Sequence, residues 1–124
     1  MAPTVCRPDD PTSRRVMAIG SPGADRITTA LAQALINQLK FGWPMDRAIA
    51  HPRIHVDTSG SADRLMAEPG LPLPATPLAL TSYESLSMYF GGVAAALFGG
   101  DRNPNFDVAA DPRREGGTAI SVNA

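Results

Sequence analysis

The sequence has few of the features that mark specialised classes of protein. Its 124 residues contain one cysteine, Cys6, so an internal disulfide is excluded. The 11 basic and 12 acidic side chains give a net charge of −1, and no basic surface predicts nucleic-acid binding. The longest uninterrupted apolar run, Val93–Phe98, is far shorter than the about 18 residues that a membrane span needs. The composition predicts a soluble protein with neither a membrane span nor a nucleic-acid partner.

Signals for export, metal binding and cofactors are also lacking. Pro3 and two aspartates occupy the N-terminal region, where a signal peptide would have a basic patch and an apolar stretch, and the compartment is left open. His51 and His55 stand four residues apart, but Pro52 interrupts the helix that this spacing would need. We therefore predict no metal site and no cofactor.

The chain is rich in apolar residues and in turn-forming residues. The apolar residues, at 44%, are enough for a core, and the 11 glycines and 12 prolines predict many loops. A length of 124 residues fits one domain at most and is compatible with part of one.

The first half of the chain predicts an alternation of strands and helices. Val16–Ile19 is typical of a strand buried on both faces. Apolar residues at a spacing of four then predict a helix over Ile27–Phe41, with Asp25 as its N-cap and Gly42 as its end. The remaining expected elements are a loop or edge segment over Met1–Arg15, a short helix Met45–Ala50 opened by Pro44, strands Arg53–Val56 and Leu65–Glu68, and an extended crossing Leu71–Pro77.

The second half is less regular. Met88–Phe98 favours helix slightly by propensity, although glycine pairs on both sides fit a short central strand. Phe106–Ala110 and Thr118–Val122 predict a hairpin with a long connection. Asp111 and Arg113, which lie in that connection, are interpreted as part of a solvated turn, with burial as the minority alternative.

The loop Gly20–Asp25 is the strongest candidate for a functional site. A glycine loop between a strand and a helix N-terminus presents backbone N–H groups that bind a phosphate, a carboxylate or an oxyanion. The loop lacks the Lys-Ser/Thr pair and the third glycine of nucleotide-binding motifs, so a nucleotide is disfavoured. Taken alone, such a loop is more often a structural tight turn that needs glycine for its backbone geometry. Thr28 and Thr29 lie inside the predicted helix and are interpreted as helix residues rather than nucleophiles.

Several short blocks, in order and spacing, resemble the C-terminal part of the small subunit of γ-glutamyltranspeptidases. They are Met1–Thr4, Gly20–Ile27, Pro52–His55, Glu68–Gly70 and Ala110–Gly117, together with Thr29, Asn37, Phe41–Gly42 and Ala48. The resemblance covers most of the chain, and only Leu71–Ser87 has no clear counterpart. Members of this family are N-terminal-nucleophile hydrolases and are often exported.

This resemblance implies an α/β fold, a partial N-terminal-nucleophile hydrolase with the layered αββα arrangement. Residues 1–124 then form an incomplete domain, the C-terminal segment of the small subunit. The family's nucleophilic threonine, which also serves as the base through its free amine, has no counterpart here. The implied enzyme transfers or hydrolyses γ-glutamyl groups of substrates such as glutathione. The chain alone is expected to be inactive, and its expected partner is the missing N-terminal portion or the large subunit.

The resemblance assigns roles to four residues of the glycine loop. Ser21, Pro22, Gly23 and Ala24 match the family's S-P-G-G loop, which supplies backbone N–H groups to an oxyanion and to the substrate. Ala24 replaces the second glycine, and a donor survives that change only where φ is negative. The family also has a strand at the region that matches Met88–Phe98, so we predict a strand there against propensity.

Two other functions fit the same residues. The first is a non-catalytic binding or assembly module, which Ala24 and the missing nucleophile favour. The second is a fragment of a related acylase that has the same mechanism and a bulkier amide substrate. The acyl-group specificity depends on residues outside this chain.

Overall fold

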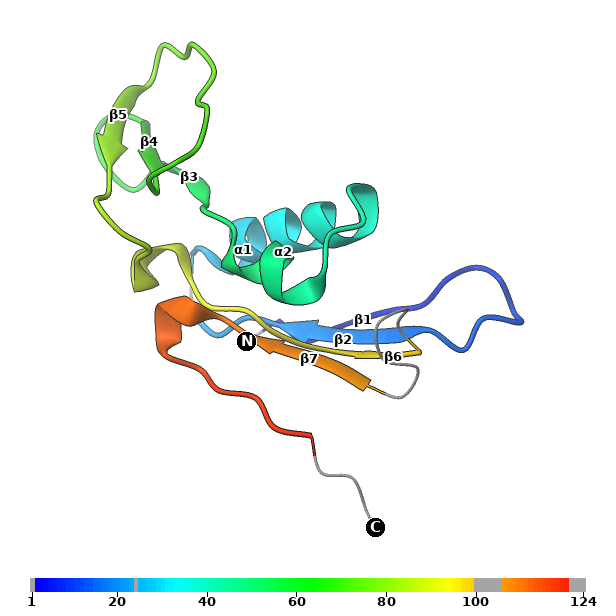
Figure 1. Cartoon of the computed structure of the whole chain (residues 1–124). Helices are drawn as coiled ribbons and strands as arrows, with labels where there is room; N and C mark the ends of the chain where they lie inside the picture. The colour runs from blue at the N-terminus through cyan, green and yellow to red at the C-terminus, as the bar shows by residue number, and fades with distance from the viewer. Residues whose placement is uncertain (1, 24, 100–105, 121–124) are drawn as a thin grey trace.

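The structure is a computed structural model that describes residues 2–23, 25–99 and 106–120 (Figure 1). Its main layer is a four-stranded sheet in the order β1-β2-β6-β7, and each neighbouring pair is antiparallel. The strands are β1 (Thr4–Cys6), β2 (Val16–Gly20), β6 (Ala94–Phe98) and β7 (Phe106–Ala110). The first and last quarters of the chain therefore meet in one sheet.

Two helices cover one face of this sheet (Figure 1). They are α1 (Ile27–Leu35), which continues into a π-helical turn (Ile36–Lys40), and α2 (Met45–Ala50). The predicted helices are confirmed, and Gly42, at φ 66°, follows the end of the first. The predicted N-cap is wrong: Arg26 occupies that position, and Asp25 instead accepts a hydrogen bond from the Arg26 guanidinium at 3.3 Å.

The hydrophobic core lies between the helices and the sheet. Alternate strand residues point to the helices because side chains of a strand alternate between its faces. The buried apolar cluster consists of Met17, Ile19, Ala95, Leu97 and Ala109 from the sheet, and Ala30, Leu31, Ala34, Met45 and Ile49 from the helices, with Val93 beside them. The apolar faces of the two helices and of the sheet thus pack against each other in one core.

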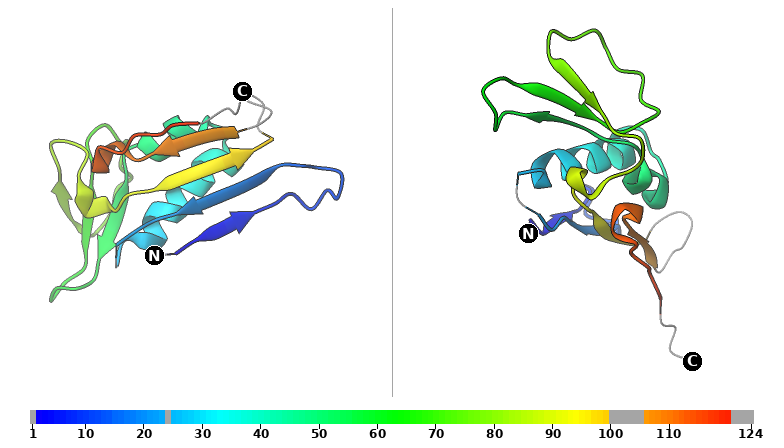
Figure 2. Two further views of the ribbon diagram at one scale, coloured as in Figure 1. Left: turned by 90° about the horizontal axis from the view of Figure 1, so that it is seen from below. Right: turned by 90° about the vertical axis from the view of Figure 1, so that its left-hand side faces the viewer.

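The opposite face of the sheet is apolar and uncovered. Its side chains, which we call the open face, are Val5, Val16, Ala18, Ala94, Ala96, Phe98, Phe106, Val108 and Ala110. No helix or strand of the described ranges lies in front of it (Figure 2, left). The prediction that Val16–Ile19 is buried on both faces is therefore wrong for this chain, and Ala18 is exposed.

A second, smaller sheet lies beside the helices. It contains β3 (Ile54–Asp57), β4 (Arg64–Ala67) and β5 (Ala79–Ser82), with β3 antiparallel and β5 parallel to β4. The strands predicted over Arg53–Val56 and Leu65–Glu68 are confirmed with a shift of one residue. Strand β5 was not predicted, because prolines dominate the stretch that leads to it.

The last part of the chain corrects two predictions. Met88–Phe98 is a 3-10 turn (Met88–Phe90) followed by β6, so the predicted strand occupies only its second half. The predicted hairpin does not form within the described residues: β7 pairs with β6, and residues 116–120 have no regular structure. A 3-10 turn at Pro112–Arg114, followed by Glu115 at φ 51°, directs the chain away from β7. Residues 121 and 122 lie outside the described ranges.

Candidate functional site

The glycine loop joins β2 to α1, as predicted. Within the loop, Ser21 is only 1% exposed, and its hydroxyl donates to the Pro22 carbonyl at 3.2 Å. The Ser21 carbonyl accepts from the Ala2 backbone N–H at 3.4 Å, which ties the loop to the chain before β1. The loop is therefore held by one hydrogen bond within it and by one backbone hydrogen bond from the segment before β1.

Gly23 gives the loop its shape. Its φ is 136°, a conformation that favours glycine. An added Cβ would have 3.8 Å to its nearest neighbour, on Ile27, so the backbone angle rather than lack of space demands glycine. Ala24, which was predicted to act with Gly23, lies outside the described residues. Its role stays a prediction.

Gly91 lies behind the loop and lets it pack closely. Its φ is 75°, and an added Cβ would lie 3.4 Å from the Ala30 Cβ and 3.6 Å from the Ser21 hydroxyl. Helix α1 begins directly after the loop, and no side chain caps its first turn. The first N–H groups of a helix have no partner within the helix, so they are available at this point.

The loop opens into a small pocket of about 240 Å³. Pro22 and Gly23 form one side, and Arg26, Tyr89 and Arg114 line the rest with Asp25, Ile27, Met88 and Gly91. Gly92 makes room for Arg114, because an added Cβ would lie 2.4 Å from the Arg114 Cδ. Two arginines and one acid, Asp25, therefore line the pocket, and Arg26 pairs with that acid.

Arg26 is oriented by an aromatic ring and a carboxylate. Its guanidinium carbon lies 4.2 Å from the Tyr89 ring centroid, and its Nη2 lies 3.7 Å from Asp57 Oδ2. The Tyr89 hydroxyl donates to the same oxygen at 3.0 Å. Hydrogen bonds from the Ser59 hydroxyl and backbone, then from Tyr89, lower the pKa of Asp57 to about 2, so this carboxylate is ionised at neutral pH. Arg26 Nε is buried without a hydrogen-bond partner among the described residues.

The two histidines have separate surroundings. His55 Nδ1 lies 3.1 Å from the Thr29 hydroxyl, and burial, followed by the charge of Arg26, lowers its pKa. His51 packs edge-on against Trp43, with 4.9 Å between ring centroids, and burial lowers its pKa too. Thr29 also donates to the Arg26 carbonyl at 3.2 Å, as expected for a residue of the first helical turn.

Four buried charged residues form a junction behind the site, which we call the charged junction: Arg53, Glu68, Asp111 and Arg113. Arg53 donates to Asp111 at 2.7 Å, and Arg113 donates to Asp111 at 3.1 Å and to both oxygens of Glu68. The two positive and two negative charges balance. Such pairing is needed because an unpaired buried charge is costly.

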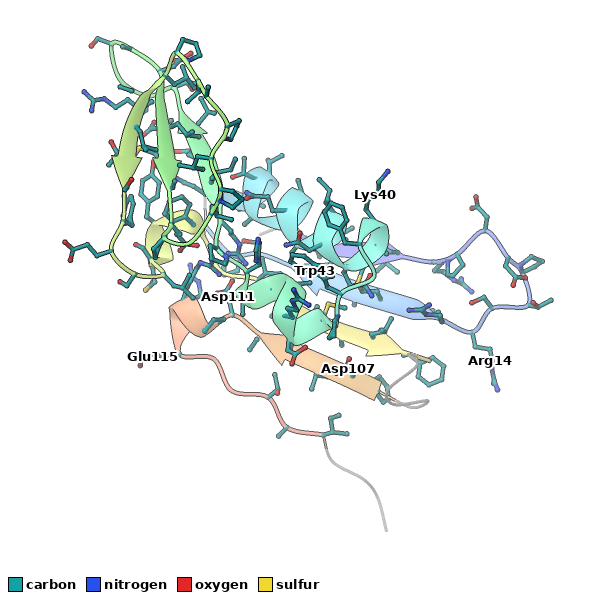
Figure 3. The ribbon with its side chains drawn as sticks, turned by 45° about the horizontal axis from the view of Figure 1, so that its top comes forward. Arg14, Lys40, Trp43, Asp107, Asp111 and Glu115 are labelled. Atoms are coloured by element: carbon teal, nitrogen blue, oxygen red, sulfur yellow. The ribbon has the colours of Figure 1, made fainter. Side chains whose placement is uncertain are left out.

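The charged junction also fixes the backbone around the glycine loop. Arg53 donates to the carbonyls of Phe90 at 3.3 Å and Gly91 at 3.2 Å, and Asp111 accepts from the Val93 N–H at 2.9 Å. The interpretation of Asp111 and Arg113 as a solvated turn is therefore wrong (Figure 3). The sequence held one signal for this burial: equal numbers of positive and negative side chains in the blocks Pro52–His55, Glu68–Gly70 and Asp111–Arg113. The sequence alone did not show that these blocks are in contact.

The comparison with protein families decides the relationship. The family model described as "Gamma-glutamyltranspeptidase" matches residues 1–121. The chain belongs to the γ-glutamyltranspeptidase family. The glutathione hydrolase proenzyme of Pseudomonas sp. (strain A14) is 29% identical over 97% of this chain, and that of Bacillus subtilis (strain 168) is 26% identical over 99%. The chain spans only 22% and 20% of the lengths of these relatives.

Solved structures share the fold. The γ-glutamyltranspeptidase of Pseudomonas nitroreducens complexed with L-DON has a TM-score of 0.67 and 23% identity, over 100% of this chain and 62% of its own. The Bacillus anthracis transpeptidase CapD, crystal form II, has a TM-score of 0.72 and 23% identity, over 98% of this chain and 70% of its own. The family membership and the partial N-terminal-nucleophile hydrolase fold predicted from the motifs are confirmed. Within the described residues, no helix is long and apolar enough to cross a membrane.

Proposed function

We propose that this chain supplies the oxyanion-binding loop of a γ-glutamyltranspeptidase-type enzyme whose nucleophile comes from polypeptide outside the chain. The observation that carries the proposal is the loop Ser21–Gly23: it is buried at Ser21, it has φ 136° at Gly23, and it precedes an uncapped helix. Backbone N–H groups held in this way stabilise the negative oxygen of a tetrahedral intermediate.

In this reaction a threonyl hydroxyl attacks the γ-glutamyl carbonyl and forms an ester, and its proton passes through the free amine of the threonine to the amine that leaves. Water or an amine acceptor then takes the acyl group. The N–H groups of Gly23 and Ala24 bind the carbonyl oxygen while it carries charge, and Ser21 and Pro22 hold the loop in place. A glutathione-type amide is the proposed substrate, as the resemblance implies.

The chain is proposed to be inactive by itself and to work with the missing N-terminal portion or the large subunit. The open face supports this requirement, because soluble monomers rarely expose a continuous apolar surface of this kind. Val5 is 67% exposed and Phe106 46% exposed on this face. A second sheet supplied by the rest of the enzyme would cover it and complete the layered arrangement.

The test is turnover of a chromogenic γ-glutamyl anilide by the chain alone and by the chain mixed with the upstream small-subunit segment and large subunit. We expect no turnover alone and turnover after mixing. In the mixture, Gly23→Val should lower kcat by roughly 10²-fold or more because it displaces the oxyanion donors. Gly60→Val is the matched control, because Gly60 has no positive φ and a Cβ added there would lie 3.8 Å from its nearest neighbour. Turnover by the chain alone would contradict the inactivity.

A non-catalytic binding module is the second candidate, and the two guanidinium groups beside the loop favour it. Arg26 and Arg114 outnumber Asp25 among the residues that line the 240 Å³ pocket, and this balance of charge suits the binding of a carboxylate without any reaction. Isothermal titration of glutamate and glutathione into the chain tests this candidate. Binding together with no turnover in the mixture would select it, and absence of binding would leave a role in assembly only.

A related acylase with a bulkier amide substrate shares the loop and the mechanism. The mixture that regains activity should be compared on glutaryl and γ-glutamyl anilides. A preference for the γ-glutamyl compound supports the transpeptidase, and a preference for the glutaryl compound supports the acylase.

A further inference from the structure

A second, larger pocket lies at the hairpin end of the helix-covered face, at the other end of β2 from the glycine loop. Its volume is about 530 Å³, within the range of small-molecule sites. Met17 and Leu97 of the sheet form its floor, and Leu39, Trp43 and Met45 line it from the helices and the turn between them. Figure 3 shows Trp43 over the sheet, with Asp107 on the strand below.

The wall around Trp43 is held in place without a ligand. The Trp43 ring packs against Phe41 at 5.9 Å and His51 at 4.9 Å between centroids, and the Arg47 guanidinium carbon lies 4.4 Å from the Trp43 ring centroid. A rigid aromatic wall loses little entropy on binding and favours an apolar ligand.

Gln38, which lines the same pocket, holds an unsatisfied acceptor. Its Oε1 is buried and has no hydrogen-bond partner among the described residues. A buried carbonyl oxygen without a donor is unfavourable, and it is rare in folded proteins. Because Gln38 lines the pocket, a turn of its side chain would present this oxygen to an N–H group of a ligand.

The charge of the pocket selects an anion. Arg7 and Arg15, both exposed on the β1–β2 hairpin, line it, and Asp107 is the single acid among the lining residues. Two guanidinium groups at the edge of an apolar pocket suit a carboxylate, which Arg binds through paired N–H donors.

We propose that this pocket binds a small carboxylic acid that has an apolar body and one N–H donor, such as an N-acylated apolar amino acid. The carboxylate contacts Arg7 and Arg15, the N–H donates to Gln38 Oε1, and the apolar body lies against Trp43. This site goes beyond the proposed acyl transfer, and its test does not depend on turnover.

The chain provides two unique reporters at this site. Trp43 is its one tryptophan and Cys6 its one cysteine, and both line the pocket. Titration with N-acetyl-L-leucine should give a saturable change in Trp43 fluorescence and should slow alkylation of Cys6. The methyl ester should bind about tenfold more weakly or worse, because it lacks the charge. The N-methyl analogue should bind about fivefold more weakly, because it lacks the donor.

Variants distinguish specific binding in the pocket from a general attraction of the acid to positive charge on the hairpin. Arg15→Gln should weaken binding about tenfold, whereas Arg14→Gln should leave it unchanged, since Arg14 lies on the same hairpin but does not line the pocket (Figure 3). Gln38→Leu should abolish the preference for the N–H compound over its N-methyl analogue. If the isolated chain shows no folded near-UV spectrum, Cys6 alkylation is measured by mass spectrometry in the mixture with its complementing polypeptides.

Three results would overturn the proposal. The first is the absence of a saturable response in both reporters. The second is equal affinity for the acid and its methyl ester, which would remove the carboxylate from the argument. The third is an equal loss on Arg14→Gln and Arg15→Gln, which would show a general effect of charge.

Discussion

The two faces of the four-stranded sheet have nearly the same chemistry and opposite surroundings. On the covered face, Met17, Ile19 and Leu97 are each less than 10% exposed, because α1 and α2 pack on them. On the open face, neighbouring positions of the same strands carry Val, Ala and Phe, yet Val5 is 67% exposed and Phe98 packs mainly against Phe106, at 5.5 Å between ring centroids.

This sheet is therefore suited to a central position in a layered fold. A sheet with one solvated face alternates apolar and polar side chains, whereas a sheet covered on both faces is apolar throughout. The strands here are of the second kind, and the chain itself supplies the cover for one face only.

The charged junction stands on the covered side, where both of its arginines donate to the Ile49 carbonyl of α2. Arg113→Ala leaves two buried carboxylates short of a partner, so we expect a loss of about 3 to 5 kcal/mol in the free energy of unfolding. Urea denaturation measures it. Arg114→Ala, at the exposed neighbour, should change stability by no more than about 0.5 kcal/mol. A loss below about 1 kcal/mol in the free energy of unfolding for Arg113→Ala would contradict a large contribution of the charged junction to stability.

A matched pair of truncations compares the faces directly. Ile19→Ala on the covered face should cost about 2 to 4 kcal/mol, because it opens a cavity in the core. Val5→Ala on the open face should cost about 0.5 kcal/mol or less in the isolated chain, because Val5 is already in water. Equal costs in urea denaturation would mean that the open face is covered in solution, by self-association for instance.

The glycine loop begins where β2 leaves the sheet, and its backbone strain gives a smaller effect. Gly23→Ala should cost about 1 to 2 kcal/mol, since φ 136° is unfavourable for alanine. Gly60→Ala serves as the control in the same thermal or urea unfolding. If the two substitutions cost the same, the loop adopts another backbone conformation in solution.

The smallest effect is a dependence on pH, which comes from His51 after α2 and His55 in β3, because the open face has no ionisable side chain. Burial lowers the pKa of His51 and His55 from 6.5, so the folded chain binds protons less readily than the unfolded chain. Stability is therefore full above pH 6.5 and declines as the pH falls below it. His55→Gln should flatten part of this slope in pH-dependent denaturation. An unchanged slope would show that His55 is solvated.

The sequence predicted the local elements well, because their signals are local. The spacing of Leu31, Leu35 and Leu39 indicated the first helix, and the position before Pro52 indicated the end of the second. The order of short blocks identified the family. The glycine loop was placed correctly, and Gly23 has the backbone conformation that a glycine requirement implies.

What the sequence did not show depends on contacts between distant residues. The burial of Asp111 and Arg113 requires Arg53 and Glu68 to come from other segments, and no local pattern indicates that meeting. The exposure of Ala18 could not be predicted either. A strand that is apolar on both faces does not indicate which of the two faces is covered by other segments of the same chain. Strand β5 was missed because its pairing with β4 rather than its composition makes it a strand.

Association with the complementing polypeptides tests the central claim most directly, because the open face is proposed to be covered by the rest of the enzyme. Light scattering during size-exclusion chromatography should show a stable complex for the natural chain and for Arg114→Ala. Phe106→Asp, which places a charge on the open face at a side chain that is 46% exposed, should leave the isolated chain folded and abolish the complex. A complex that forms equally well with Phe106→Asp would contradict the account.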